Sequence, residues 1–220
     1  MIKQVHVGEC DSTQDVLKEQ LISSPHETVL VSCDHQIAGR GRGENKWLSL
    51  PGTLCFSMNV APHPIMSFTA IELSVLVAKF FENKQAVLKL KWPNDVWDRN
   101  GKKCGGILVQ GTQNQLLAGI GLNLFHGKEF GEIFPEEFPF NKKELALELA
   151  VYIKNNRYQD SAGLEKDWLL RCGHLNQIVR VSEGTEVTEG MFQGLGQYGE
   201  ALVCQDGQIK HLYNGTLRLV

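Results

Sequence analysis

Residues 36–47 of this 220-residue chain, Gln-Ile-Ala-Gly-Arg-Gly-Arg-Gly-Glu-Asn-Lys-Trp, alternate three glycines with two arginines. Glycine has no Cβ, so backbone N–H groups in this stretch can approach a ligand closely. Arg40 and Arg42 carry planar guanidinium groups that match carboxylate and phosphate oxygens. The alternative, a solvated surface loop, leaves the entropic cost of these glycines unexplained. The stretch is therefore predicted to bind an anion and to gain order when the anion is bound.

A second stretch, Lys-Trp-Pro-Asn-Asp at 91–95, ends an apolar segment that is typical of a strand. Proline and asparagine interrupt a strand ladder, so an ordinary turn is the simplest interpretation. A tryptophan beside a proline is, however, costly to place in an exposed turn. We therefore interpret the stretch as one wall of a site, to which Asn94 and Asp95 present polar groups.

Two glycine-containing stretches follow. Lys103 precedes a Gly-Gly pair at the start of an apolar strand; taken alone, it would be a solvated hairpin lysine. Residues 119–121 read Gly-Ile-Gly inside the next strand, which indicates either a β-bulge or the close approach of another group. Asn123 lies near the end of that strand and needs a hydrogen-bond partner if it is buried.

Hydrophobic patterns place these stretches between strands and helices. Alternating or continuous apolar residues predict strands at 2–7, 27–35, 52–60 and 86–92, with two more on either side of 112–114. Helical spacing predicts helices at 11–24, 67–83, 141–158 and 161–172, the first with Ser12 as its N-cap. Residues 125–140, rich in Gly, Pro and Phe, are expected to be irregular.

The end of the chain differs from the rest. From residue 176 onward only short strand patterns and turns occur, which predicts a small β-barrel at 176–220 after an α/β-containing domain at 1–175. Residues 194–199 read Gly-Leu-Gly-Gln-Tyr-Gly. A dinucleotide-binding turn must open a helix, whereas this segment lies between two strand patterns, so it is predicted to be a hairpin turn.

Composition excludes several classes of protein. The net charge of −3 gives no general attraction to nucleic acid. No apolar run reaches the roughly 18 residues needed to span a membrane, and the N-terminus alternates like a strand rather than a signal peptide. Six cysteines without a Cys-x-x-Cys pair indicate reduced thiols in a cytoplasmic protein, and the histidines show no metal-type spacing.

Taken in order, the four stretches closely resemble the motif set of the biotin protein ligase family. Asp-Ser-Thr-Gln at 11–14 is similar to that family's Ser-Thr-Asn start, and the strand-rich tail resembles its SH3-like C-terminal domain. The resemblance covers essentially the whole chain. It implies an α+β fold with a mixed, mostly antiparallel sheet backed by helices, like that of class II aminoacyl-tRNA synthetases, followed by a five-stranded SH3-like barrel.

The resemblance also implies an activity. Family members join biotin to ATP, release pyrophosphate, and transfer biotin from biotinyl-5′-AMP to one lysine of a biotin carboxyl carrier protein, here of the acetyl-CoA carboxylase type. The cofactors implied are ATP and Mg²⁺, with biotin as substrate. The family's N-terminal DNA-binding helix-turn-helix is not expected, because the Ser-Thr motif begins at residue 12. The expected protein is cytoplasmic, monomeric or homodimeric, and binds neither nucleic acid nor membrane.

Site residues follow from the same resemblance. The catalytic cations implied are Lys103, Arg42 and Arg40. The residues implied for biotin are Ser12, Thr13, Gln14, Gln36, Arg40, Gly41, Arg42, Trp47, Lys103, Gly106 and Gly121. Those implied for the nucleotide are Arg42, Lys46, Asn94, Asp95, Lys103 and Asn123. The metal is expected to arrive with ATP, and Asp95 is the one side chain expected as a candidate ligand for it.

Two departures from the family pattern stand out. Gln14 replaces the more usual asparagine, and Gly43-Glu44-Asn45 replaces a stretch that often carries additional arginines. Two alternative functions remain: a lipoate or octanoate ligase, whose family shares the lysine-bearing fold without the paired Gly-Arg-Gly-Arg and Trp-Pro-Asn-Asp motifs, and a non-catalytic biotin-binding module. A pure binder would not need Arg42 and Lys103 beside a phosphate.

Overall fold

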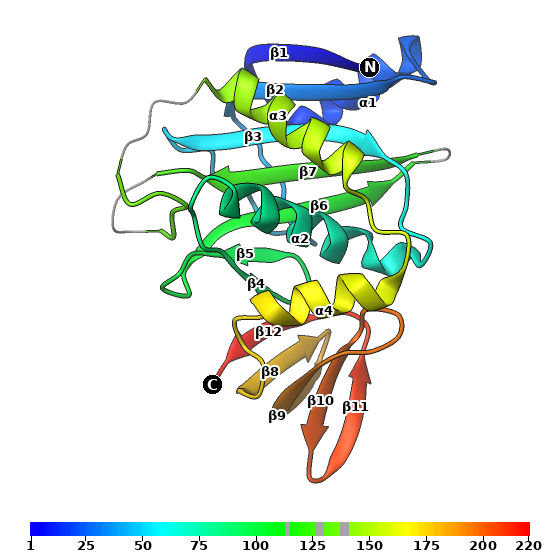
Figure 1. Cartoon of the computed structure of the whole chain (residues 1–220), viewed down its shortest axis with the longest axis vertical. Coiled ribbons are helices and arrows are strands. Elements are labelled where there is room, and N and C mark those ends of the chain that lie inside the picture. Colours follow the sequence, from blue (N-terminus) through cyan, green and yellow to red (C-terminus); the bar gives the residue numbers. More distant parts are fainter. Residues whose placement is uncertain (113–114, 126–129, 137–140) are drawn as a thin grey trace.

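A computed structural model of the chain describes residues 1–112, 115–125, 130–136 and 141–220. A seven-stranded mixed sheet forms the larger part (Figure 1). Its strands, in spatial order, are β1 (Ile2–Cys10), β2 (Thr28–Gln36), β3 (Thr53–Val60), β7 (Leu116–Asn123), β6 (Lys103–Gly111), β5 (Asp95–Trp97) and β4 (Lys89–Lys91). Strands β1 and β2 are parallel, and the other neighbours are antiparallel, which confirms the predicted mostly antiparallel sheet.

Helices cover both faces of this sheet. Helices α2 (Thr69–Glu82) and α3 (Lys142–Asn155) cross one face (Figure 1), where a large apolar cluster lies. On the other face, α1 (Thr13–Ser23) packs Leu17 against Val29, Val31 and Leu117. Successive side chains of β2 enter the two clusters in turn, because neighbouring side chains of a strand point to opposite faces of the sheet. A short 3₁₀ helix, Met66–Phe68, precedes α2.

Helix α1 begins where its sequence predicts. Ser12 has an extended backbone, and its hydroxyl accepts a hydrogen bond from the Gln14 N–H, as an N-cap residue does. The cap stops the chain just after β1 and turns it into the helix. Thr13 and Gln14 consequently lie at the helix N-terminus, over strands β2, β3 and β7.

The C-terminal part forms a second, antiparallel sheet of five strands. In spatial order these are β11 (Gln208–Leu212), β10 (Ala201–Gln205), β9 (Glu186–Leu195), β8 (Ile178–Glu183) and β12 (Thr216–Leu219). Five strands are as predicted, but β11 and β12 stay at opposite ends of this order, without the pairing that would close a barrel among the described residues. Residues 196–200 form the turn between β9 and β10, which confirms that 194–199 is not a dinucleotide-binding loop.

Helix α4 (Ser161–Arg171) lies between the two sheets (Figure 1). Its Trp168 is fully buried and contacts the rings of His174 and Phe192, the latter from β9. Trp92, also buried, donates its indole N–H to the Gly199 carbonyl in the β9–β10 turn at 3.0 Å. One apolar cluster therefore runs across both sheets, and the division at residues 175/176 stays a prediction.

The main difference from the predicted elements is β5, a strand that was not predicted. The turn after the strand at 86–92 is present, but it occupies only three residues before the chain re-enters the sheet at Asp95. The expected turn at 112–114 and the irregular segment 125–140 fall partly outside the described residues. In the part of the chain that is described, no helix has the length and apolar character needed to cross a bilayer.

Candidate functional site

One cavity of about 620 Å³ brings together residues from both sheets. All but one of the site residues predicted from the sequence line it: Ser12, Thr13, Gln14, Gln36, Arg40, Gly41, Arg42, Lys46, Trp47, Asn94, Asp95, Lys103, Gly106 and Gly121. The exception is Asn123. Segments that are far apart in the sequence therefore meet at one cavity, as they must if they form one site.

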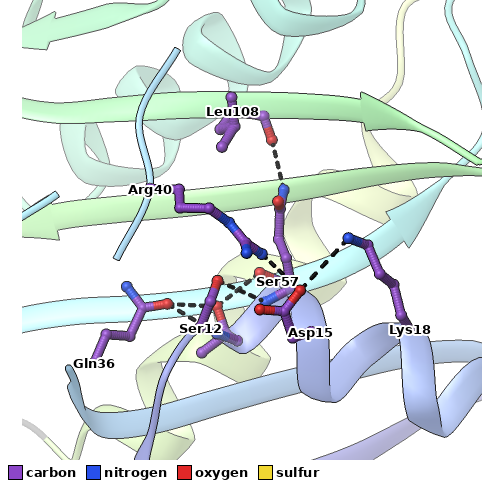
Figure 2. Close-up of polar contacts among 9 residues, drawn as sticks. Ser12, Asp15, Lys18, Gln36, Arg40, Ser57 and Leu108 are labelled. Carbon is purple, nitrogen blue, oxygen red and sulfur yellow. Dashed lines mark hydrogen bonds and ion pairs between the residues drawn. The ribbon is translucent and has the colours of Figure 1, made fainter. Parts of the chain in front are cut away.

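A neutral polar network lines the α1 side of the cavity (Figure 2). The Gln36 side-chain oxygen accepts hydrogen bonds from the Thr13 N–H at 2.9 Å and from the Thr13 hydroxyl at 3.1 Å. That hydroxyl also lies 2.7 Å from the Ser57 hydroxyl. These residues are buried and carry no charge, so they suit a neutral polar ligand group better than an ion.

Gln14, at the departure from the family pattern, is buried beside this network. Its amide N–H donates to the Leu108 carbonyl at 3.1 Å, while its side-chain oxygen is buried without a hydrogen-bond partner among the described residues. A Cβ at position 119 would lie 2.9 Å from the Gln14 amide nitrogen, so Gly119 makes room for the longer side chain. An unsatisfied buried acceptor next to a cavity favours a ligand that supplies an N–H donor.

The glycine-arginine loop is folded as a small hairpin beside this network. The Gly41 N–H donates to the Asn45 carbonyl at 2.7 Å, and the Trp47 N–H donates to the Gly39 carbonyl at 2.9 Å. Trp47 then lies over a strand position that has no side chain: a Cβ at Gly121 would come within 2.5 Å of its ring. The indole therefore forms an apolar wall that only glycine at 121 permits.

The two arginines of the loop point to different partners. Arg40 donates to the Asp15 carboxylate on α1 at 2.7 Å (Figure 2), and this bond lowers the pKa of Asp15. Arg42 donates to the Gly215 carbonyl, in the turn before β12, at 3.2 Å. Burial lowers the pKa of Arg42, and the nearby charge of Asp95 opposes that effect. Arg42 thus connects the loop to the C-terminal sheet.

Lys103 is the first residue of β6, and its side chain borders the cavity. Its ammonium lies 2.6 Å from one carboxylate oxygen of Asp95, and Lys91 lies 2.7 Å from the other. Burial would raise the pKa of Asp95, but the charges and hydrogen bonds of Lys103 and Lys91 lower it. The carboxylate is therefore ionised, and with two lysines beside it the group carries one net positive charge.

Metal binding by Asp95 is not supported by this arrangement. Both carboxylate oxygens are already ion-paired, and a divalent cation there would lie beside two ammonium groups. Over the described ranges, no group of three or more His, Cys, Asp or Glu side chains could hold a metal ion. The expectation that Asp95 is a Mg²⁺ ligand does not fit these contacts.

The two asparagines have structural partners. Asn94 donates its amide to the Ile107 carbonyl at 2.6 Å, and the Ile107 N–H donates to the Asn94 carbonyl at 3.0 Å, which fixes the turn against β6. Asn123 is buried outside the cavity: its amide accepts from the Thr53 hydroxyl at 3.2 Å and donates to the Gly131 carbonyl at 3.4 Å. Its polarity within an apolar strand is explained by these bonds, so we do not place it in the site.

Several residues that line the cavity were not foreseen. Among them are Ser57 and Leu108 of the larger sheet, and residues 182–184 at the end of β8 and 214–217 at the start of β12. Gly184 and Gly215 lie in the turns after β8 and before β12, with positive φ angles of 59° and 122° that glycine adopts readily. Nothing local in the sequence shows that these turns face the glycine-arginine loop.

The model of the biotin/lipoate A/B protein ligase family matches residues 7–124, which include the polar network, the glycine-arginine loop and Lys103. The chain belongs to this family. Among solved structures, this family member is similar to the biotin protein ligase from Aquifex aeolicus in complex with biotin and ATP, with a TM-score of 0.79, 25% identity and 99% coverage of both chains. The shared fold confirms the predicted α+β class.

Curated sequences agree with this assignment. The family member is 26% identical over 195 residues to the biotin–[acetyl-CoA-carboxylase] ligase of Paracoccus denitrificans, covering 76% of this chain and 80% of that protein. It is 38% identical over 124 residues to the biotin–protein ligase of Schizosaccharomyces pombe, covering 50% of this chain. The chain spans only 19% of the length of that relative, and 38% and 35% of two Arabidopsis thaliana biotin–protein ligases.

Proposed function

We propose that this chain activates biotin with ATP to form biotinyl-5′-AMP and transfers the biotinyl group to a lysine of a carrier protein. The observation that carries the proposal is the cavity, in which a neutral polar network at Thr13 and Gln36 is continuous with a cationic side at Arg42 and Lys103. Biotin has this division itself, with a neutral ureido ring at one end and a carboxylate at the other.

The ureido ring would occupy the α1 side. Ser12, Thr13 and Gln36 offer hydroxyl and amide groups there, and the unpaired Gln14 oxygen would accept a ring N–H. Trp47, for which Gly121 makes room, would cover the apolar valeryl chain, while Gly106 would leave space for that chain along β6.

The first chemical step joins two anions. A biotin carboxylate oxygen attacks the α-phosphorus of ATP, a new P–O bond forms, and the bond to pyrophosphate breaks. At about 4 Å, with an effective dielectric constant near 20, two unit charges repel by roughly 4 kcal/mol. Lys103 and Arg42 would offset this repulsion, most strongly where charge builds in the transition state. Arg40 could contribute only by exchanging its present partner, Asp15, for the ligand.

In the second step, the neutral amine of the acceptor lysine attacks the acyl carbon and loses a proton to solvent, an amide bond forms, and the bond from the acyl carbon to the phosphate oxygen breaks so that AMP leaves. Lys46, Asn94 and Asp95 line the cavity and would lie on its nucleotide side, with Asn94 fixing the turn that holds Asp95. Mg²⁺ would enter as the complex with ATP rather than on a site of the protein. Residues 182–184 and 214–217 would form the outer wall.

The acceptor we propose is a biotin carboxyl carrier domain of the acetyl-CoA carboxylase type. The name of the Paracoccus relative supports this choice. We also propose that residues 176–220 form a second functional unit. The protein would be cytoplasmic and monomeric or homodimeric, and it would bind neither nucleic acid nor membrane.

Biotin-dependent ATP–pyrophosphate exchange tests the first step. We expect exchange with biotin and none with lipoate or octanoate, because the neutral polar network is matched to a ureido ring. Exchange with lipoate or octanoate instead of biotin would favour the other branch of the family. Biotin binding without any exchange would favour a non-catalytic module.

The glycine-arginine loop yields a prediction about order. We expect the backbone amides of residues 39–46 to exchange slowly when biotin and a non-hydrolysable ATP analogue are bound, and at least about tenfold faster without them. Anionic ligands would supply new partners for the guanidinium groups of Arg40 and Arg42, which now donate to Asp15 and to the Gly215 carbonyl. Hydrogen exchange read by mass spectrometry checks this, with α2 as an internal reference. Equal protection in both states would contradict it.

Gly121 yields a prediction about biotin affinity. Gly121→Ala would place a Cβ 2.5 Å from the Trp47 ring and force the indole away from the strand. We expect biotin to bind at least about tenfold more weakly, measured by titration calorimetry, because the apolar wall moves. Gly111→Ala is the matched control: its Cβ would meet Leu116 at an ordinary 3.8 Å. Unchanged affinity in Gly121→Ala would show that Trp47 does not cover biotin.

A further inference from the structure

Asp95 is shared by two lysines that differ in their freedom to move. Its side chain is only 13% exposed, and each carboxylate oxygen faces one ammonium, Lys103 at 2.6 Å and Lys91 at 2.7 Å. A buried carboxylate is stable while it is paired, and losing its last partner is strongly unfavourable. Whether Lys103 can leave Asp95 therefore depends on what else holds that carboxylate.

Lys91 is held in place. It lies directly opposite Asp95 in the pairing of β4 with β5, and its side chain is 14% exposed. Its ammonium also lies over the Trp97 ring, 5.5 Å from the ring centre. The Lys103 side chain, by contrast, is 51% exposed and borders the cavity.

From these contacts we infer that Lys91 is a positioning residue: it keeps Asp95 paired, so that Lys103 can move from Asp95 to the substrate anions. The inference rests on the proposed function, in which Lys103 contacts the biotin carboxylate and the α-phosphate. With Lys91 present, the departure of Lys103 leaves a paired carboxylate. Without Lys91, the same movement would leave a buried carboxylate with no ion-pair partner and only the nearby charge of Arg42, so Asp95 would retain Lys103.

Lys91 also borders the cavity, so the competing explanation is direct contact with a phosphate. The two explanations differ in their dependence on Asp95. A residue that acts through Asp95 loses its effect when that charge is removed, whereas a residue that binds phosphate keeps it.

The kinetic test compares Lys91→Met in two backgrounds. In the wild-type background we expect kcat/KM for ATP in biotin-dependent pyrophosphate exchange to fall at least about tenfold, with biotin affinity within about twofold. Lys91→Arg, which keeps the charge, should retain most of the activity. Lys89→Met, an exposed lysine on the same strand, is the matched control and should leave activity unchanged.

In the Asp95→Asn background, Lys91→Met should lower kcat/KM for ATP by less than about twofold. An equal loss in both backgrounds would assign Lys91 to direct substrate contact and overturn the inference. Full activity of Lys91→Met in the wild-type background would overturn it as well.

A second measurement is independent of catalysis. Limited acetylation of the folded protein, followed by peptide mass spectrometry, reports how often the Lys103 amine is neutral and unpaired. We expect Lys91→Met to slow labelling of Lys103 about fivefold or more, Lys89→Met to leave it unchanged, and Lys91→Met/Asp95→Asn to restore it. If the wild-type protein showed no biotin-dependent pyrophosphate exchange, the proposed function would fail. The labelling of Lys103 would still decide whether Lys91 positions it. Unchanged labelling of Lys103 in Lys91→Met would overturn the inference.

Discussion

Replacing Lys103 by alanine is expected to reduce biotinyl-5′-AMP formation by about three orders of magnitude, the scale of removing a transition-state charge partner. Lys103 is the half-exposed cation at the cavity mouth, and in the proposed reaction it faces both the carboxylate and the α-phosphate. Biotin binding should weaken much less, because the network at Thr13 and Gln36 is untouched. Single-turnover formation of labelled adenylate, with a separate biotin titration, measures both quantities.

Lys102→Ala provides the matched control for this experiment. Lys102 is the exposed neighbour of Lys103 and does not line the described cavity. Near-normal adenylate formation in Lys103→Ala would show that this lysine is not the main cation of the first step. An equal loss in Lys102→Ala would indicate a general electrostatic effect instead.

Replacing Trp92 by alanine should have the second large effect, on stability. The side chain is 1% exposed, belongs to the core shared by both sheets, and donates to the Gly199 carbonyl. Truncating a buried tryptophan typically costs about 3–5 kcal/mol of unfolding free energy. Urea unfolding followed by circular dichroism measures the change. Because Trp92 borders the cavity, ligand affinity should fall together with stability.

Trp92→Phe separates packing from hydrogen bonding. Phenylalanine keeps most of the aromatic volume but leaves the Gly199 carbonyl without its donor, so we expect a loss of about 1–2 kcal/mol. A change of less than about 1 kcal/mol in Trp92→Ala would contradict the view that this side chain joins the two sheets.

Features governed by local chemistry were predictable from the sequence. Ser12 caps α1 because a hydroxyl before a helical pattern satisfies a free N–H, and that rule needs no tertiary contact. The glycines at 119 and 121 indicated either a β-bulge or close approach; β7 pairs with β3 and β6 there without a register shift, and Trp47 is the group that approaches Gly121. The segment at 194–199 was predicted to be a turn from its place between strands, and the β9–β10 turn follows directly from Leu195.

Features that depend on strand register were not predictable in the same way. The family resemblance implied that Asn123 is a site residue, but β3 pairs with β7 so that Thr53 lies directly opposite and hydrogen-bonds to it. Lys91 contacts Asp95 because β4 pairs with β5. Strand β5 has only three residues, which is too short to produce a recognisable pattern in the sequence. Long-range pairing of this kind is set by the whole sheet.

Transfer of biotin to a carrier tests the central claim most directly. A carboxyl carrier domain of the acetyl-CoA carboxylase type is incubated with this protein, biotin and ATP, and its intact mass is measured. We predict the addition of one biotinyl group, which requires biotin and ATP, disappears with Lys103→Ala, and is absent when the acceptor lysine of the carrier is replaced by arginine. A carrier that stays unmodified, although the protein binds biotin and ATP, would contradict the account.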